Sequence, residues 1–120
     1  MTSLTDRISA LVDARFDEEV AFLAELVKVP SDNPPGDCAP HAEVTAKLLE
    51  ALGFVVSRHP VPKAVVEAAG MRTATNIVAR RDYGAGGPVI ALNIHGDVVP
   101  PGEGWTADPY GAEIRDGWMY

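Results

Sequence analysis

Apolar residues recur at three- and four-residue intervals near the start of the chain, a pattern that predicts an amphipathic helix. Its apolar face comprises Ile8, Leu11, Val12, Phe16, Val20, Leu23, Leu26 and Val27. Thr5 can cap the start of this helix, and Pro30 ends it. We interpret Asp17, Glu18 and Glu19 as a solvated acidic face, with or without a kink, rather than a metal-binding cluster. The alternative is a second helix that begins at Asp17 with an acidic first turn.

A second helix is predicted from Pro40 to Leu52, with apolar positions at Val44, Leu48, Leu49 and Leu52. The preceding segment, Pro30–Pro40, reads as a loop because Asn-Pro, Pro-Pro and Gly-Asp are turn signals. Gly53 stands where a left-handed C-cap is needed, and Phe54–Ser57 then reads as a short strand. A helix, a glycine and a strand in this order are typical of α/β folds.

Weaker periodic segments follow. Lys63–Ala69 predicts one or two helical turns, and Asn76–Arg80 reads as a second strand. The glycine-rich segment Tyr83–Pro88 connects it to a third strand that starts at Val89. An antiparallel hairpin is the simplest pairing of the second and third strands.

The last residues predict another hairpin. Ala112–Arg115 and Trp118–Tyr120 flank Asp116-Gly117, a pair suited to a type I′ turn because both central residues need positive φ. The pattern as a whole predicts an α/β fold with two helices followed by a mixed sheet with hairpins. No internal repeat or linker divides the chain, so residues 1–120 read as one domain or as part of a larger one.

The stretch Ile90–Trp105 is an apolar strand that ends in polar residues. Alternation along a strand places Asn93, His95 and Asp97 on one side, opposite Ile90, Leu92, Ile94 and Val98. A neutral imidazole is a good zinc ligand, and a nearby carboxylate can hold its other ring N–H and fix the tautomer. An isolated histidine is ordinarily structural. At the end of an apolar strand, where α/β folds build their sites, His95 and Asp97 are instead expected to form part of one.

Composition excludes some classes of function. An apolar share of 47% and a charged share of 22% are ordinary for a globular chain. Ten Lys and Arg against 17 Asp and Glu give a net charge of −7, which argues against a nucleic-acid or anionic-membrane surface. Cys38 is the single cysteine, and the first thirty residues carry neither a signal-peptide core nor a spanning segment. A cytoplasmic protein is therefore expected.

Several residues carry weaker signals. Cys38 and His41 have a spacing that could bind metal, but no second ligand pair occurs, so a loop cysteine and a surface histidine are preferred. His59 reads as a surface residue at a strand end, and Trp105 and Trp118 are expected to pack in the turn and hairpin rather than stack on a ligand. The serines lack a Gly-x-Ser-x-Gly setting, and the Gly-Ala-Gly-Gly run precedes a strand, which disfavours a phosphate-binding loop.

The run from His95 to Tyr120 resembles the first metal-site motif of the co-catalytic zinc metallopeptidases and deacylases. This family includes acetylornithine deacetylase, succinyl-diaminopimelate desuccinylase, carboxypeptidase G and aminoacylase. The likeness extends through Val-Val-Pro, Gly-x-x-Trp, Asp-Pro-Tyr and the Asp-Gly hairpin, and upstream through Val-Pro-Ser, Asn-Pro-Pro-Gly and Thr-Asn-Ile-Val-Ala. Ile94 departs from the small residue usual in the family, and we expect only a packing change from it. The resemblance covers essentially the whole chain and implies the N-terminal portion of the α/β catalytic domain.

Carried over to this chain, the resemblance implies that His95 binds one of two zinc ions, for which Co²⁺ can substitute. Asp97 would be the catalytic aspartate that orients and polarises this imidazole. The implied reaction is hydrolysis of the amide bond of an N-acyl amino acid or small peptide. The implied partners are that small-molecule substrate and, in the full-length protein, a second subunit in a homodimer, with neither nucleic acid nor membrane.

The later ligands of the family do not occur within residues 1–120. They are a bridging aspartate after Gly-Arg-Gly, a Glu-Glu pair, a further carboxylate and a late histidine, and the lid domain is missing as well. One histidine cannot hold a catalytic zinc, so we expect these residues alone to be inactive and to bind zinc weakly or not at all. We also expect uncovered apolar strand surface that disfavours a stable monomer. The alternative is a non-catalytic module that keeps the scaffold and binds a partner.

Overall fold

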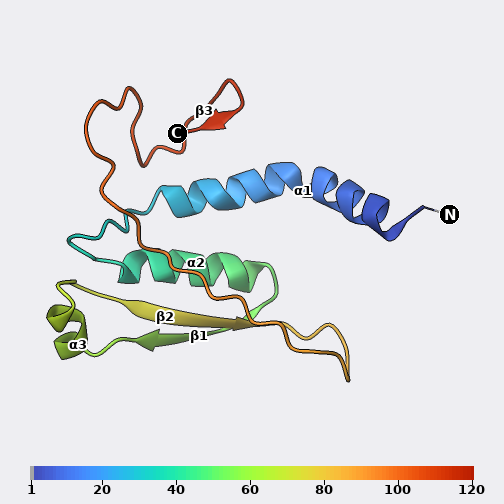
Figure 1. Ribbon diagram of the computed structural model, residues 1–120, viewed down its shortest axis with the longest axis horizontal. Helices are drawn as coiled ribbons and strands as arrows, with labels where there is room; N and C mark the ends of the chain where they lie inside the picture. Colours follow the sequence, from blue (N-terminus) through green and yellow to red (C-terminus); the bar gives the residue numbers. More distant parts are fainter. Residues whose placement is uncertain (1) are drawn as a thin grey trace.

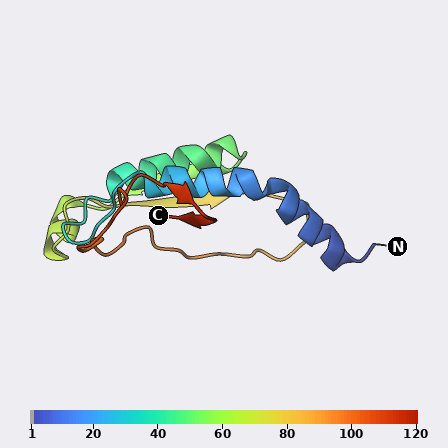
Figure 2. The ribbon, with the colours of Figure 1, turned by 90° about the horizontal axis from the view of Figure 1, so that it is seen from above.

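The computed structural model describes residues 2–120, which form a thin slab with extents of 55 × 42 × 19 Å (Figure 1). In chain order the elements are α1 (Leu4–Val27), α2 (Ala39–Ala51), β1 (Val55–Pro60), α3 (Lys63–Ala68), β2 (Thr75–Arg80), β3 (Ile114–Arg115) and β4 (Trp118–Met119). Helices α1 and α2 lie side by side, and α2 covers one face of the β1–β2 sheet (Figures 1 and 2). The chain thus combines helices and strands, as predicted.

Helix α1 begins two residues earlier than predicted, because Ser3 and not Thr5 is its N-cap. The Ser3 hydroxyl accepts from the Asp6 N–H at 3.1 Å, and the Ser3 N–H donates to the Asp6 carboxylate at 3.1 Å. This capping box needs an acceptor three residues after the cap, which Asp6 supplies for Ser3. The two bonds hold the pKa of Asp6 below its ordinary value.

The predicted single helix is confirmed. Asp17, Glu18 and Glu19 are exposed within it, so they form the solvated acidic face and not the start of a second helix. Figure 2 shows a bend in the N-terminal half of α1. None of residues 4–27 is buried, and the apolar side chains of its first half, among them Ile8 and Phe16, remain exposed. Only the C-terminal half of the helix lies beside α2 (Figure 1).

Helix α2 ends in the predicted glycine cap. Gly53 has a φ of 87°, and its N–H donates to the Glu50 carbonyl at 2.9 Å. The Phe54 N–H donates to the Leu49 carbonyl at 3.1 Å, which completes a Schellman motif and turns the chain into β1. Ala46, which has no exposed surface, lies on the side of α2 that packs against the sheet and α1.

Strands β1 and β2 pair antiparallel, from Val55 opposite Arg80 to Pro60 opposite Thr75. Strand β1 is therefore longer than the predicted Phe54–Ser57, and its proline is tolerated because it ends the strand. The predicted helical turns at Lys63–Ala69 are confirmed as α3, which connects the two strands. One sheet face, with Val56 and Ile77, is half-buried under α2, and the other is exposed.

The predicted third strand is wrong for the residues that the structure describes. Residues 89–97 form an extended chain that belongs to neither sheet, so the predicted hairpin with Asn76–Arg80 does not form. The described residues form two separate antiparallel sheets in place of the predicted single mixed sheet. Val89, Ile90, Leu92 and Ile94 are 81–86% exposed. Figure 2 shows this segment running apart from the sheet, on the side away from α2. A strand can pair along both of its edges, and β2 uses one edge for β1, but residues 89–97 do not pair with the other. The expected uncovered apolar surface is thus present.

The C-terminal hairpin is confirmed. Ile114 pairs with Met119 and Arg115 with Trp118. Asp116 and Gly117 have φ values of 53° and 81°, as a type I′ turn requires.

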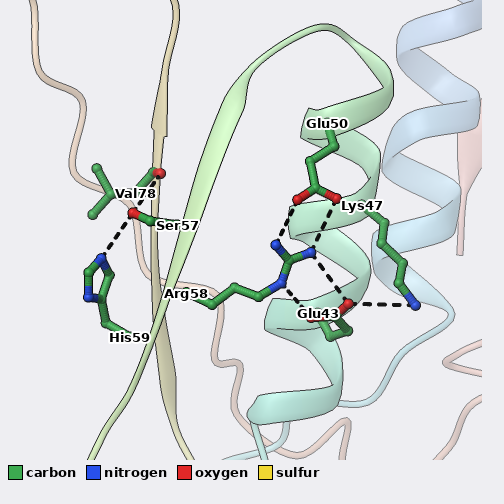
Figure 3. A network of polar contacts seen from close by, with 7 residues as sticks. All are labelled: Glu43, Lys47, Glu50, Ser57, Arg58, His59 and Val78. Atoms are coloured by element: carbon green, nitrogen blue, oxygen red, sulfur yellow. Dashed lines mark hydrogen bonds and ion pairs between the residues drawn. The ribbon is translucent and has the colours of Figure 1, made fainter.

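A fork of ion pairs joins the sheet to α2 (Figure 3). Arg58 on β1 contacts Glu43 through Nε and Glu50 through Nη1, both at 2.7 Å, and Lys47 lies 3.6 Å from Glu43. Hydrogen bonds from Arg58 lower the pKa of both Glu43 and Glu50, and the two carboxylates raise the pKa of Arg58. The planar guanidinium reaches two carboxylates seven residues apart on one face of the helix.

We predict that Arg58→Met lowers the melting temperature at neutral pH, and that this loss disappears in acid. Both glutamate pKa values are lower in the folded than in the unfolded protein, so the stabilisation is present above about pH 4.5, the unfolded value. It is lost as the pH falls through the folded pKa values. Thermal denaturation of wild type and variant across this range measures the difference. Lys63→Met, which removes the exposed 3.6 Å pair with Glu67, is the control and should have little effect. A loss independent of pH would contradict the prediction.

Candidate functional site: the loop before α2 and the His95–Asp97 segment

The loop that precedes α2 holds the polar end of the extended segment, more than sixty residues away in sequence. The Val98 N–H donates to the Ser31 carbonyl at 3.2 Å, and the Asn33 N–H donates to the Val98 carbonyl at 2.8 Å. These bonds form an isolated parallel bridge between Asp32 and Val98. Ser31 is buried, with 3% of its surface exposed. Its hydroxyl donates to the Gly96 carbonyl at 2.7 Å. The backbone on both sides of Asp97 is therefore fixed.

The same loop is bound on its other side to the segment before β2. The Arg72 and Thr73 N–H groups donate to the Gly36 carbonyl at 3.1 and 3.0 Å, and the Cys38 N–H donates to the Thr73 carbonyl at 3.1 Å. Gly36 has a φ of +70°, and a Cβ there would lie 2.7 Å from the Cγ of Met71. Both the backbone and the space require glycine.

His95 and Asp97 contact each other. The Nδ1 of His95 lies 3.1 Å from Oδ1 of Asp97 and 3.0 Å from the Asp97 carbonyl oxygen. Both partners accept hydrogen bonds only, so Nδ1 carries a proton, and in the neutral imidazole the lone pair is then on Nε2. The His95 side chain is 86% exposed and that of Asp97 38%. The sequence placed both on one face of a strand, and the structure brings them together in an unpaired extended chain.

Asn33 is a third member of this group that the sequence did not single out. Its amide Nδ2 donates to Oδ2 of Asp97 at 3.2 Å, so each carboxylate oxygen has its own partner. Asn33, and after it His95, hold the pKa of Asp97 below its ordinary value. The aspartate is thus anionic at neutral pH and faces the imidazole. The turn signal in the Asn-Pro-Pro-Gly loop indicated where the chain bends, but not which residue it meets.

His41 closes the site from α2. A Cβ on Gly96 would lie 3.1 Å from Nδ1 of His41, so the residue between His95 and Asp97 has little room for a side chain. Burial lowers the pKa of His41. Burial, followed by the charge of Asp97, raises the pKa of Cys38, whose sulfur lies 3.7 Å from the Ser31 carbonyl oxygen. Cys38 is half-buried, and a thiol with a raised pKa is a weak nucleophile and metal ligand, in keeping with the structural interpretation of Cys38.

Tyr110 ties the chain beyond the site to the same loop. Its hydroxyl donates to the Asp32 carboxylate, and its N–H donates to Oδ1 of Asp108 at 2.9 Å. The hydrogen bond to Asp32 raises the pKa of Tyr110 to about 12. The sequence motif included Tyr110 in Asp-Pro-Tyr but did not pair it with Asp32, which is 78 positions away.

Three of the weaker candidates, His59, Trp105 and Trp118, lie outside this group. His59 lies on the exposed face of β1, where Nε2 is 3.0 Å from the Ser57 hydroxyl (Figure 3), as expected of a surface residue. The Trp105 indole N–H donates to the Pro101 carbonyl at 2.7 Å, so it packs on the Pro-Pro-Gly turn. Trp118 is exposed in the hairpin. Within residues 2–120 no three His, Cys, Asp or Glu side chains are grouped so that they could hold a metal ion.

Comparison with known proteins identifies the class. A succinyl-diaminopimelate desuccinylase of Acidiphilium cryptum is 37% identical over 103 residues, which cover 86% of this chain and 24% of that protein. Another, of Rhizorhabdus wittichii, is 43% identical over 93 residues, which cover 75% and 22%. A Bacillus subtilis protein named as a dipeptidase is 54% identical over 39 residues, 32% of this chain and 8% of that protein. No family model matches the chain, and no solved structure matches it.

The relatives that align with most of this chain are desuccinylases, enzymes of the amidohydrolase class. The chain belongs to the metallopeptidase and deacylase family that contains succinyl-diaminopimelate desuccinylase. It spans about a quarter of the length of the curated relatives that it matches, 24% and 22% for the first two. None of the helices between residues 2 and 120 is long and apolar enough to cross a membrane.

We predict that Gly36→Ala releases the loop from the segment before β2. The left-handed backbone costs about 1–2 kcal/mol for a residue with a Cβ, and the contact with Met71 adds ~1–3 kcal/mol. Gly70→Ala is the matched control, because its φ is +75° but nothing lies within 4 Å of its Cβ position. Urea denaturation should show the larger loss for Gly36→Ala. Equal losses would show that the Met71 contact costs nothing.

We predict that Tyr110 ionises near pH 12, where an ordinary tyrosine does so near pH 10. Its folded pKa is raised, so the bond to Asp32 stabilises the fold fully below about pH 10 and is lost as the pH rises toward 12. The difference in phenolate absorbance between wild type and Tyr110→Phe isolates this group. Asp32→Asn should return the transition toward 10. A difference titration near pH 10 in wild type would contradict the bond.

Proposed function

We propose that the full protein is a zinc-dependent hydrolase that cleaves the amide bond of N-acyl amino acids or small peptides, with His95 as a zinc ligand and Asp97 as the aspartate that orients it. The observation that carries the proposal is the His95–Asp97 contact, which places a proton on Nδ1, so that the lone pair of the neutral, exposed imidazole is on Nε2. An unprotonated imidazole nitrogen backed by a carboxylate is the donor that zinc prefers. The names of the curated relatives support the reaction class.

The described residues of this chain would supply one ligand to the metal, Nε2 of His95. Asp97 accepts the Nδ1 proton, fixes the tautomer and raises the basicity of Nε2 through its negative charge. A catalytic zinc site takes three protein ligands and a water, so His95 supplies one ligand and residues 2–120 do not complete the set. Zinc, or Co²⁺ in its place, would supply Lewis-acid activation of water and of the substrate carbonyl.

The proposed substrates are N-succinyl amino acids, because the relatives that align with most of this chain are named as desuccinylases. A dipeptide is the second class to test, since a shorter alignment joins this chain to a protein named as a dipeptidase. We further propose that the full protein is a homodimer. In the alternative, a non-catalytic binding module, the His95–Asp97 pair would be a surface feature without a metal.

His95→Ala in the full protein tests the proposal. We expect zinc content to fall by about one ion per chain. Turnover of N-succinyl-diaminopimelate and of a dipeptide should fall by more than ~100-fold. This loss exceeds the ~10–100-fold that is typical when a residue that only orients a metal ligand, such as Asp97, is removed. Elemental analysis and initial rates measure the two effects. His59→Ala is the control, because His59 is exposed on β1, where its ring nitrogen contacts the Ser57 hydroxyl (Figure 3). Unchanged zinc content and turnover in His95→Ala would reject the proposed role and favour the binding module.

A further inference from the structure

Asn33 makes two separate contacts with the polar end of the extended segment. Its backbone N–H donates to the Val98 carbonyl at 2.8 Å, and its side-chain amide donates to Oδ2 of Asp97 at 3.2 Å. The backbone contact fixes where the segment lies. The side-chain contact fixes how the Asp97 carboxylate is turned, because it occupies one of the two oxygens.

We infer that Asn33 is a positioning residue, which turns the Asp97 carboxylate so that Oδ1 faces Nδ1 of His95. Only the expected effect of Asn33 on turnover rests on the proposed function, because the hydrogen bonds of Asn33 do not depend on that function. A carboxylate on an extended chain can rotate about its last bond, and a second hydrogen bond to the opposite oxygen restricts that rotation. Donation from an amide to an anion is also stronger than a neutral hydrogen bond.

The identity of the residue matters, because only a donor fits. The oxygen that Asn33 meets belongs to an anion, so an amide N–H is suitable where a second carboxylate would repel it. Asp32, the preceding residue, is directed elsewhere and accepts from Tyr110. The loop therefore separates two functions: Asp32 binds the chain that follows the site, and Asn33 binds the site itself.

The side chain can be removed without losing the bridge. The bonds of Val98 with Ser31 and Asn33 are between backbone atoms, and the Ser31 hydroxyl independently holds the Gly96 carbonyl. Asn33→Ala and Asn33→Leu therefore remove the amide donor and leave the segment in place. Leucine keeps the same number and branching of heavy side-chain atoms, which guards against an effect of an empty space.

The decisive measurement is the tautomer of His95, read from the nitrogen chemical shifts of its imidazole in the full protein. Zinc is first removed with a chelator, and the pH is set well above the ordinary imidazole pKa of about 6.5. His95→Gln identifies the signal by its absence. Wild type should show mainly the Nδ1–H form, and both Asn33 variants should show a mixture with the Nε2–H form. Hydrogen-exchange protection of the Val98 amide reports that the bridge remains.

In the zinc-loaded protein the same variants should lower kcat for N-succinyl-diaminopimelate by about 10–100-fold with little change in KM, the loss typical of residues that orient a metal ligand. Asn76→Ala, at an exposed position of β2, is the matched control and should behave as wild type. The tautomer decides the inference: an unchanged Nδ1–H population in both Asn33 variants would overturn it. Failure of the proposed function would appear instead as unchanged zinc and turnover in His95→Ala, a result that leaves the tautomer measurement intact.

Discussion

The two backbone hydrogen bonds between Val98 and residues 31–33 are the contacts on which the site depends. The apolar segment that leads to His95 has no strand partner among residues 2–120, so no sheet holds it in register. The bridge to the loop before α2, supported by the Ser31 hydroxyl, takes over that role. His95 and Asp97 are therefore positioned by a loop and not by the edge of a sheet. A loop can position functional residues only when the rest of the fold fixes its own conformation.

This loop is held because it is bound on both sides. Gly36 and Cys38 bond to the segment before β2, while Ser31 and Asn33 bond to the site segment. Gly36 permits the close approach of Met71, which any side chain would obstruct. The loop thus connects the β1–β2 sheet, which α2 covers, to the segment that carries His95 and Asp97, and it fixes their relative positions.

Few apolar side chains are buried among the described residues, and two apolar surfaces are exposed. Ala46, Val66 and Ala112 are the buried apolar residues among those described, whereas the segment with Ile90 and Leu92 and the first half of α1 are exposed. Apolar surface of this extent marks a contact region in soluble proteins. Arg58, by contrast, forms its ion pairs with Glu43 and Glu50 near the surface, where they link the sheet to α2.

Local pattern was sufficient for elements whose stabilising contacts are close in sequence. Helix α2 with its Gly53 cap and the Asp116-Gly117 turn follow from residues within a few positions of each other, and the alternation that places His95 and Asp97 on one side needs only strand geometry. The cap of α1 was misplaced by two residues because Thr5 and Ser3 are both competent and only Ser3 has Asp6 at the right distance. The tertiary structure decided the rest: that β2 pairs with β1, that residues 89–97 remain unpaired, and that Asn33, Asp32 and Tyr110 meet near the site. The contacts among these join residues from 15 to 78 positions apart. Nothing in a local pattern specifies which distant donor will reach a given carboxylate, because that depends on how the packed elements bring the chain together.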